Sequence, residues 1–588
     1  MWDSFVRGFG VVLLVCVATV TWAAPPNIVM ILTDDQGWGD LSVHGNTNLA
    51  TPRIDSLAKD GAMFSRFYVQ PVCAPTRAEM LTGRYHPRTG VRGVSRGEER
   101  MNTDESTLAE MLNAAGYATG MFGKWHNGTQ DQYHPNARGF DEFYGFTHGH
   151  WGTYFDTPMD HNGEEVRGKG FIIDDLTNHG LDFIEDNKGQ PFFCYLAYNT
   201  PHSPFQVPDK FYAKFDGVDP KMKHRDPEKE EIDKTRAALA MVENIDWNVG
   251  RVLEKLAELD LEEDTIVIYF SDNGPNSWRW NNDMRGKKGT VDEGGVRVPC
   301  FIKWPGKIAG QTQIETIAGA IDFLPTLAEM TGTKPLGTKP IDGRSLVPLL
   351  QGTDAQWDER YIFSFQNTGT ISARDQNFIL DQGKRLYDLK ADPGQRKNVN
   401  MEHPEIAEKM TAAVKAIHES VAIGVADGPR PFSVGRGPTS FTDLPARDGI
   451  ESGEIQRSNR APNCSFFTHW TRTEDVITWN VDVGKAGLYE AVVYYTCPED
   501  AVGSKIALTL GDAQVAATVD EAHDSPLYGE EHDRADRGTE SFMKDFRPMT
   551  LGRIQLAEGK GTLRLSALEI PGSQAIDVYR IVLHQIAE

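Results

Sequence analysis

Two continuous apolar runs, each followed by oxygen-bearing side chains, constrain the fold of this chain most. Residues 28–32 lead into Thr33-Asp34-Asp35, and residues 265–270 lead into Ser271-Asp272-Asn273-Gly274. Apolar runs without polar alternation are typical of strands buried on both faces of a mostly parallel sheet. Because ligands bind beyond the carboxyl ends of such strands, we expect the two segments at one edge of a single sheet.

Strand-like and helix-like segments alternate through residues 24–345. Further strands are predicted over 117–122 and 191–198, and helices over 108–115 and about 233–259. This alternation predicts an α/β fold with a large, mostly parallel or mixed sheet flanked by helices.

The pattern changes toward the C-terminus. Residues 346–423 are predicted to form a small α+β subdomain that ends in a helix near 405–421, and the Gly- and Pro-rich segment 424–449 is interpreted as a linker. Residues 450–588 alternate apolar and polar side chains between turn residues, which predicts an all-β sandwich. Two interpretations of this accessory domain stay open, a carbohydrate-binding module and a structural domain.

The chain length, the net charge and the N-terminal sequence limit the classes of protein to which this chain can belong. A chain of 588 residues is too long for one core. Its net charge of −24 excludes nucleic acid as a natural partner. Residues 1–23 resemble a signal peptide, with Arg7 before a short apolar run. We therefore expect an exported protein, periplasmic or secreted and not membrane-spanning, and a lipoprotein attached at Cys16 is a weaker alternative.

The remaining cysteines do not form a disulfide-dense framework. Cys194 and Cys300 lie in apolar runs, which predicts buried thiols. Cys464 and Cys497 could pair within the accessory domain, and the sequence leaves this open.

The polar residues at the predicted sheet edge suggest a metal site. Asp34, Asp35, Asp272 and Asn273 offer only hard oxygen ligands, which favour calcium or magnesium over zinc. Each pair could instead be a strand-end cap or a turn, but two pairs at one edge favour a metal.

The string Cys73-Ala74-Pro75-Thr76-Arg77 is the strongest local motif. Pro75 or Thr76 is predicted to begin a helix, so that Cys73 lies just before an N-terminus, where free N–H groups favour anions. A packing cysteine or an ordinary reactive thiol would fit the same residues.

With Leu81-Thr82-Gly83-Arg84 behind it, this string resembles the signature of the formylglycine-dependent (type I) sulfatases of the alkaline phosphatase superfamily. The resemblance extends as ordered motifs over roughly the first 420 residues. It implies that a formylglycine-generating enzyme oxidises Cys73 to formylglycine during export. It also implies that one calcium ion lies beside Cys73, bound by Asp34, Asp35, Asp272 and Asn273.

Further motifs receive roles from the same resemblance. Lys124 and Lys288 would bind the sulfate, and Arg77 would hold the formylglycine hydrate. His126 would take a proton from the hydrate, and His202 would donate one to the leaving oxygen. Lys287 neighbours Lys288, but the spacing to Glu293-Gly294-Gly295 favours Lys288. Asn127 departs from the family pattern, which usually has an apolar residue there.

These features predict a sulfatase, with two alternatives. A phosphate or phosphonate ester hydrolase of the same superfamily is disfavoured because such relatives tend to have His where this chain has Asn273. A non-catalytic carbohydrate-binding protein would keep Cys73 as a thiol.

Substrate contacts are predicted for Arg279 and Trp280, since arginine can bind anions and tryptophan can stack on sugar rings. A sulfated saccharide is the predicted substrate, with aryl sulfates as surrogates. Weaker candidates for the pocket are Arg96, Arg100, His148, His150, Trp151, Trp278 and Arg285.

Overall fold

The computed structural model describes residues 25–353, 357–367, 369–422 and 430–586. The predicted signal peptide and Cys16 lie outside these residues. No helix in the described part of the chain is long and apolar enough to cross a membrane.

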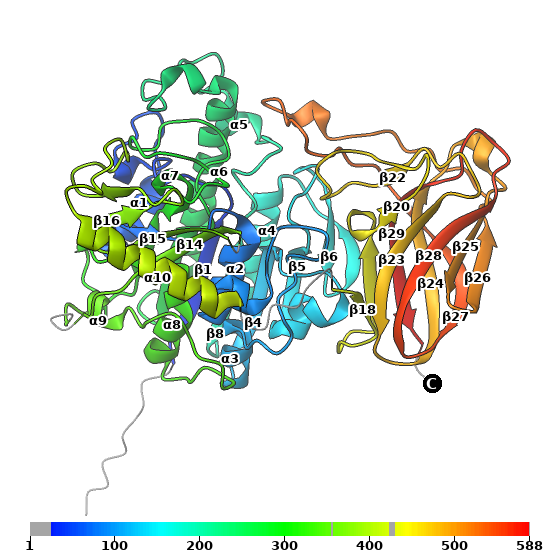
Figure 1. The fold of residues 1–588 in the computed structure, drawn as a ribbon, viewed down its shortest axis with the longest axis horizontal. Helices are drawn as coiled ribbons and strands as arrows, with labels where there is room; N and C mark the ends of the chain where they lie inside the picture. Colours follow the sequence, from blue (N-terminus) through cyan, green and yellow to red (C-terminus); the bar gives the residue numbers. More distant parts are fainter. Residues whose placement is uncertain (1–24, 354–356, 368, 423–429, 587–588) are drawn as a thin grey trace, which may run out of the picture.

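A ten-stranded sheet forms the centre of the N-terminal part (Figure 1). Its strand order is β12 (Thr312–Ile314), β2 (Ala62–Phe64), β11 (Cys300–Lys303), β9 (Thr265–Ser271), β1 (Asn27–Thr33), β8 (Phe192–Ala197), β4 (Ala118–Lys124), β5 (Glu142–Phe146), β6 (Pro158–His161) and β7 (Glu164–Arg167). From β9 to β5 all neighbours are parallel, whereas β11 and β6 run antiparallel to theirs. The carboxyl ends of five adjacent strands therefore lie on one edge.

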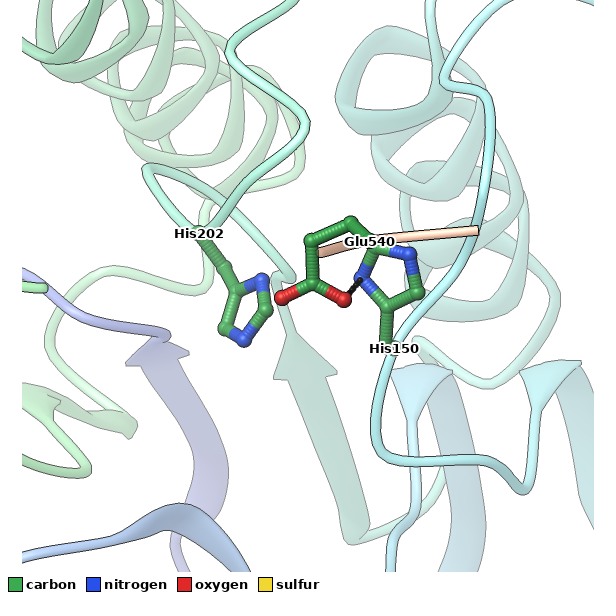
Figure 2. A group of neighbouring side chains, drawn as sticks. All are labelled: His150, His202 and Glu540. Carbon is green, nitrogen blue, oxygen red and sulfur yellow. Dashed lines mark ion pairs between the residues drawn. The ribbon is translucent and has the colours of Figure 1, made fainter. Parts of the chain in front are cut away.

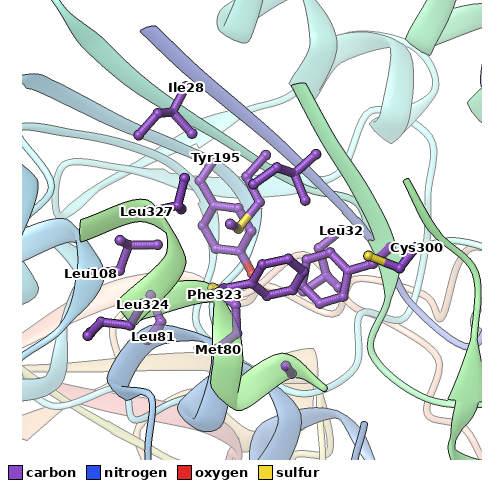
Figure 3. Packing of buried hydrophobic residues seen from close by; sticks show 14 of the residues in the cluster. Ile28, Leu32, Met80, Leu81, Leu108, Tyr195, Cys300, Phe323, Leu324 and Leu327 are labelled. Atoms are coloured by element: carbon purple, nitrogen blue, oxygen red, sulfur yellow. The ribbon is translucent and has the colours of Figure 1, made fainter. Parts of the chain in front are cut away.

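Burial on both faces explains the apolar runs. All seven residues of β1 are buried. Ile28, Met30 and Leu32 contact one hydrophobic cluster, and Val29 and Ile31 contact the other, on the opposite face. Figure 3 shows the first cluster, in which α8 (Phe323–Thr331) brings Leu324 and Leu327 toward the sheet. On the second face, α6 (Ile232–Glu258) contributes a continuous row of buried side chains.

The predicted helices appear as α3 (Leu108–Ala114), α6 and α10 (Pro404–Ala422). The helix that carries the cysteine motif, α2 (Cys73–Thr82), begins at Cys73 itself, earlier than predicted. Pro75, predicted at or near the helix start, lies instead in the first turn, whose N–H groups have no partner within the helix, so the helix can begin two residues before it. Cys73 is therefore the first residue of the helix.

A small antiparallel sheet follows the central sheet. It comprises β14 (Ile362–Asn367), β15 (Thr370–Arg374), β16 (Phe378–Leu380) and β17 (Leu386–Asp388). The helix α10 covers it through Met410 and Val421, which share a cluster with Phe365 and Ile371.

Two six-stranded sheets form the C-terminal part (Figure 1). One contains β18 (Phe432–Val434), β20 (Ile450–Glu451), β23 (Val476–Val483), β25 (Lys505–Leu510), β26 (Ala513–Thr518) and β28 (Gly559–Glu569). The other contains β19 (Phe441–Pro445), β21 (Gln456–Arg457), β22 (Phe467–Thr468), β24 (Gly487–Thr496), β27 (Arg547–Leu556) and β29 (Asp577–Gln585). Their apolar faces share one core. The predicted fold class, an α/β sheet domain, an α+β segment and an all-β sandwich, is confirmed.

The segment predicted as a linker, 424–449, differs from the expectation. Both β18 and β19 lie inside it and pair with β23 and β29. Phe432, Val434 and Leu444 bury their side chains in the sandwich core. Three apolar residues among many Gly and Pro give no clear strand periodicity, and this is why the sequence did not predict these strands. Cys464 and Cys497 are buried free thiols, so the disulfide left open by the sequence is not present.

Candidate active site

Four neighbouring strands deliver the predicted site residues to the same sheet edge. Asp34 follows β1, Asp272 follows β9, His126 follows β4 and His202 follows β8. Register fixes their depth, because Thr33 pairs with Ser271 and Leu32 pairs with Ala197. Residues far apart in sequence therefore meet.

The predicted metal ligands surround one point at this edge. Asp34, Cys73 and Asp272 each place one ligand atom within 4.8 Å of the others, and Asp34, Asp35 and His202 do the same. Asn273 donates its Nδ2 to Asp35 Oδ1 at 2.7 Å, so its amide oxygen is free to point elsewhere. All four predicted ligands are brought together.

Unpartnered oxygens identify what this point could hold. Asp34 Oδ1 and Asn273 Oδ1 are buried without any hydrogen bond from the described residues. Burial and the nearby Asp34 raise the pKa of Asp272 to about 7 in spite of Arg77. Burial also raises the pKa of Asp34, but Lys124 and the other cations lower it well below its ordinary value. Crowded carboxylates and orphaned oxygens fit a hard cation with oxygen ligands.

Three cations hold these carboxylates. Arg77 donates from Nη2 to Asp272 Oδ2 at 2.9 Å and from Nη1 to Lys124 O at 2.6 Å. Lys124 Nζ lies 2.5 Å from Asp34 Oδ2. Lys288 Nζ lies 2.7 Å from Asp35 Oδ1, whereas Lys287 Nζ donates to Asn276 O at 3.0 Å. The structure thus separates Lys288 from its neighbour.

Cys73 lies at the start of α2, beside the carboxylates. Its side chain is buried, and burial raises the pKa of the thiol to about 11, although Lys124 and Lys288 oppose this. An unmodified Cys73 is therefore a poor nucleophile at neutral pH. Asn127, which departs from the family pattern, donates its Nδ2 to Ala74 O at 3.1 Å and so holds the first turn of this helix.

The two predicted histidines differ in their surroundings. His126 shares a hydrogen bond of 2.8 Å between Nε2 and Val94 O, and its buried Nδ1 has no hydrogen-bond partner among the described residues. Burial and Lys124 hold the pKa of His126 well below its ordinary value. His202 places Nδ1 2.6 Å from Ser203 O and Nε2 3.6 Å from Asp35 Oδ2. A neutral His126 can accept a proton, and Nε2 of His202 faces the metal edge.

Arg279 lies elsewhere than predicted. Its guanidinium is 1% exposed and donates to Asp40 at 2.7 Å, to Asp35 O at 3.0 Å and to Ser277 at 2.8 Å. Because all three of its nitrogens are engaged inside the protein, the side chain is not available to substrate. The expected substrate contact is replaced by a structural one that supports the loop of Asp35.

The other predicted pocket residues are scattered. Trp280 is half-buried beside Gly39. Arg100 is buried and donates to Pro431 O, and Arg285 pairs with Asp292. Trp151 and His148 are buried, whereas Arg96 is exposed and Trp278 is half-buried. His150 lies close to His202, with 5.7 Å between ring centroids.

A small cavity of about 230 Å³ opens at the metal edge, and it includes residues that the sequence did not point to. Asp35, His202 and Lys288 of the catalytic part line it. Asp536, Arg537 and Glu540 also line it, from the long connection between β26 and β27 of the β-sandwich. No local motif marks this connection, because its relation to the site exists only through the packing of the two parts of the chain.

Comparisons with known proteins assign the chain to a family. The family model described as Sulfatase matches residues 26–333, and the chain therefore belongs to the sulfatase family, whose members hydrolyse sulfuric esters. A second model, N-sulphoglucosamine sulphohydrolase, C-terminal, matches residues 286–420.

Individual proteins whose sequences are similar to this chain are also named sulfatases. The chain is 34% identical to arylsulfatase A of Homo sapiens over an alignment of 427 residues that covers 65% of this chain and 80% of the relative. It is 33% identical to N-acetylgalactosamine-6-sulfatase of Mus musculus over an alignment of 379 residues that covers 58% of this chain and 69% of the relative. Among solved structures, that of Ps i-CgsB in complex with k-i-k-neocarrahexaose is similar with a TM-score of 0.61 and 30% identity, and covers 67% of this chain and 93% of its own.

Proposed function

We propose that this sulfatase is an exported, calcium-dependent enzyme that removes sulfate from a sulfated saccharide, using a formylglycine made from Cys73 by a formylglycine-generating enzyme. The observation that carries the proposal is the convergence at one sheet edge. Three carboxylates, an amide oxygen, two lysines and the N-terminus of α2 meet there. Asp34 Oδ1 and Asn273 Oδ1 are buried there without a hydrogen bond from the described part of the chain.

Two groups would be added to this chain. Asp34, Asp35, Asp272 and Asn273 would hold calcium, which would draw charge from the sulfate oxygens. A formylglycine at position 73 would supply, as its hydrate, the hydroxyl that attacks sulfur.

The side chains of the protein do the rest. Lys124 and Lys288 neutralise the charge that develops on the sulfate, and in a buried site this stabilisation is large. Arg77 ties Asp272 to the backbone of Lys124 and so fixes the distance between the metal loop and α2.

The two histidines divide the proton transfers. His202, held by its contact with Ser203 O, directs Nε2 toward the leaving oxygen and protonates it. His126 uses its unpartnered Nδ1 to take the proton that must leave position 73 when sulfate is expelled.

A saccharide substrate is supported by the relatives. N-acetylgalactosamine-6-sulfatase carries a sugar in its name, and the Ps i-CgsB structure contains an oligosaccharide. The proposed arrangement is a signal peptide over 1–23, a catalytic domain over 24–345, a C-terminal subdomain over 346–423 and an accessory β-sandwich that begins at β18. Export rests on the N-terminal sequence alone.

The test is a comparison of ester classes. Protein co-produced with a formylglycine-generating enzyme should hydrolyse 4-nitrophenyl sulfate faster than 4-nitrophenyl phosphate, lose activity in a calcium chelator and release sulfate from a panel of defined sulfated oligosaccharides. Faster phosphate hydrolysis would establish a phosphatase. Saccharide binding with no turnover of any ester would establish a binding protein. Activity on aryl sulfates alone would exclude a saccharide as the substrate.

A further inference from the structure

Three side chains meet beside the cavity at the metal edge, and one of them comes from the β-sandwich. His150, His202 and Glu540 each place one ligand atom within 4.8 Å of the others (Figure 2). Glu540 Oε2 lies 3.2 Å from His150 Nδ1. Glu540 Oε1 accepts from Ser203 Oγ at 3.2 Å, from a residue 337 positions away in sequence. Glu540 therefore contacts His150 and also the loop that carries His202, the proposed proton donor.

The segment that carries Glu540 is fixed to the catalytic part of the chain. Arg537 donates to Gly152 O at 2.9 Å, and Arg534 N donates to Phe205 O at 2.9 Å. Asp533 forms a β-bridge with Gln206, just beyond His202. Cys464 of the sandwich donates its Sγ to His150 O at 2.7 Å. These anchors hold the carboxylate in place.

The carboxylate is charged and accessible from the cavity. Burial raises its pKa, but His150, His202 and Lys288 lower it below the ordinary value of a glutamate. Its side chain is 20% exposed and lines the cavity together with Asp35 and Lys288. The walls of the cavity thus differ, with Lys288 where the sulfate would lie and Glu540 beside the proton donor for the leaving oxygen.

We propose that Glu540 forms part of the subsite for the leaving alcohol, where it accepts a hydrogen bond from a hydroxyl next to the sulfate ester and excludes a second anion at that position. This inference rests on the proposed function, and it assigns the preferred substrate to saccharides whose neighbouring hydroxyl is free. Charged hydrogen bonds to hydroxyls are strong, whereas two anions at this distance repel each other. The β-sandwich would then be part of the specificity site.

A metal ion bound by the three side chains is the competing explanation. In the proposed reaction Nε2 of His202 faces the leaving oxygen and Nδ1 contacts Ser203 O, so the ring has no further nitrogen for a second metal. Glu540 Oε1 accepts from Ser203 and Oε2 lies 3.2 Å from His150, so both oxygens already have protein partners and retain only one lone pair each for a hydroxyl donor. These contacts favour a polar wall over a metal site.

The experiment compares three substrates in the mature full-length enzyme. They are 4-nitrophenyl sulfate, the best-cleaved monosulfated oligosaccharide of the panel, and its counterpart with a second sulfate on the neighbouring hydroxyl. Glu540→Gln should lower kcat/KM about tenfold on the monosulfated substrate, raise it on the disulfated one, and lower it less on 4-nitrophenyl sulfate, which has no neighbouring hydroxyl, than on the monosulfated substrate. Glu530→Gln, an exposed residue of the same segment, should leave all three unchanged.

Each other outcome has a defined meaning. Glu540→Asp keeps the charge and should keep the discrimination against the second sulfate. A Glu540→Gln enzyme that matches the wild type on both saccharides would overturn the inference, as would an equal loss on all three substrates. A dependence of the wild type on added zinc that Glu540→Gln abolishes would establish the metal site instead. Wild-type enzyme that cleaves no saccharide at all would refute the proposed substrate class itself.

Discussion

At the scale of single residues, the site depends on which of two adjacent lysines reaches the metal edge. Lys288 contacts Asp35, and Lys287 turns away to Asn276 O and lies over the ring of Trp278. Both residues are lysines and they are adjacent in sequence, so a substitution of Lys287 is a matched control for the same substitution of Lys288.

We predict that Lys288→Ala lowers kcat for 4-nitrophenyl sulfate by about 10²–10³-fold, because it removes a buried cation from the developing charge. Lys287→Ala should cost less than about threefold. Steady-state kinetics of both variants measure this, and equal losses would place the sulfate elsewhere.

The burial of Cys73 predicts that its oxidation to formylglycine takes place before the protein folds. With a pKa of about 11, the unmodified thiol is protonated at pH 8, and the thiolate increases only as pH rises toward that value. In folded protein made without the maturing enzyme, iodoacetamide at pH 8 should alkylate Cys73 at least about a hundredfold more slowly than in denatured protein. Rapid labelling of the folded protein would contradict this and would allow oxidation after folding.

At the scale of elements, the close approach of β4 and β8 sets the depth of Lys124, His126 and His202. Gly123 has φ of 125°, and a Cβ at this position would lie 2.0 Å from Ala197 O. Any side chain would therefore push the two strands apart.

Gly123→Ala should destabilise the protein by about 3 kcal/mol or more. Gly116→Ala is the control, since its φ is 88° but nothing lies within 4 Å of an added Cβ; it should cost only about 1–2 kcal/mol of backbone strain. Denaturant unfolding compares them, and similar losses would show that strain alone matters at both positions.

Much of the arrangement of strands and helices could be predicted from the sequence. The apolar runs of β1 and β9 predicted the sheet and the edge at which Asp34 and Asp272 meet, because parallel strands leave little freedom in where their ends lie. The start of α2 was predicted too late because proline is tolerated throughout the first turn of a helix, so Pro75 does not mark the first residue. Arg279 was assigned to substrate because its buried partner, Asp40, is far away in sequence.

At the scale of the whole molecule, the β-sandwich is joined to the catalytic part by buried polar contacts. Arg447 Nη2 lies 2.7 Å from Glu99 Oε1, and both side chains are 1% exposed. Arg447 also donates to Thr129 Oγ1 at 2.9 Å. Such contacts cannot be predicted from one sequence, and this is why Glu540 was not among the predicted site residues.

Arg447→Ala should destabilise the protein by about 3–5 kcal/mol, because it leaves Glu99 as a buried charge without its partner. Replacing both residues, as Arg447→Met with Glu99→Leu, should recover most of that loss. Calorimetry should also show the two parts of the wild type unfolding in one transition. Two well-separated transitions would mean that the interface contributes little.

The mass of the peptide that contains Cys73 decides whether catalysis depends on a formylglycine at this position. In protein that hydrolyses 4-nitrophenyl sulfate, we predict that this peptide carries an aldehyde, which reacts with a hydrazide, and that the aldehyde fraction rises in proportion to specific activity. Full activity in a preparation whose Cys73 is entirely an unmodified thiol would contradict the account.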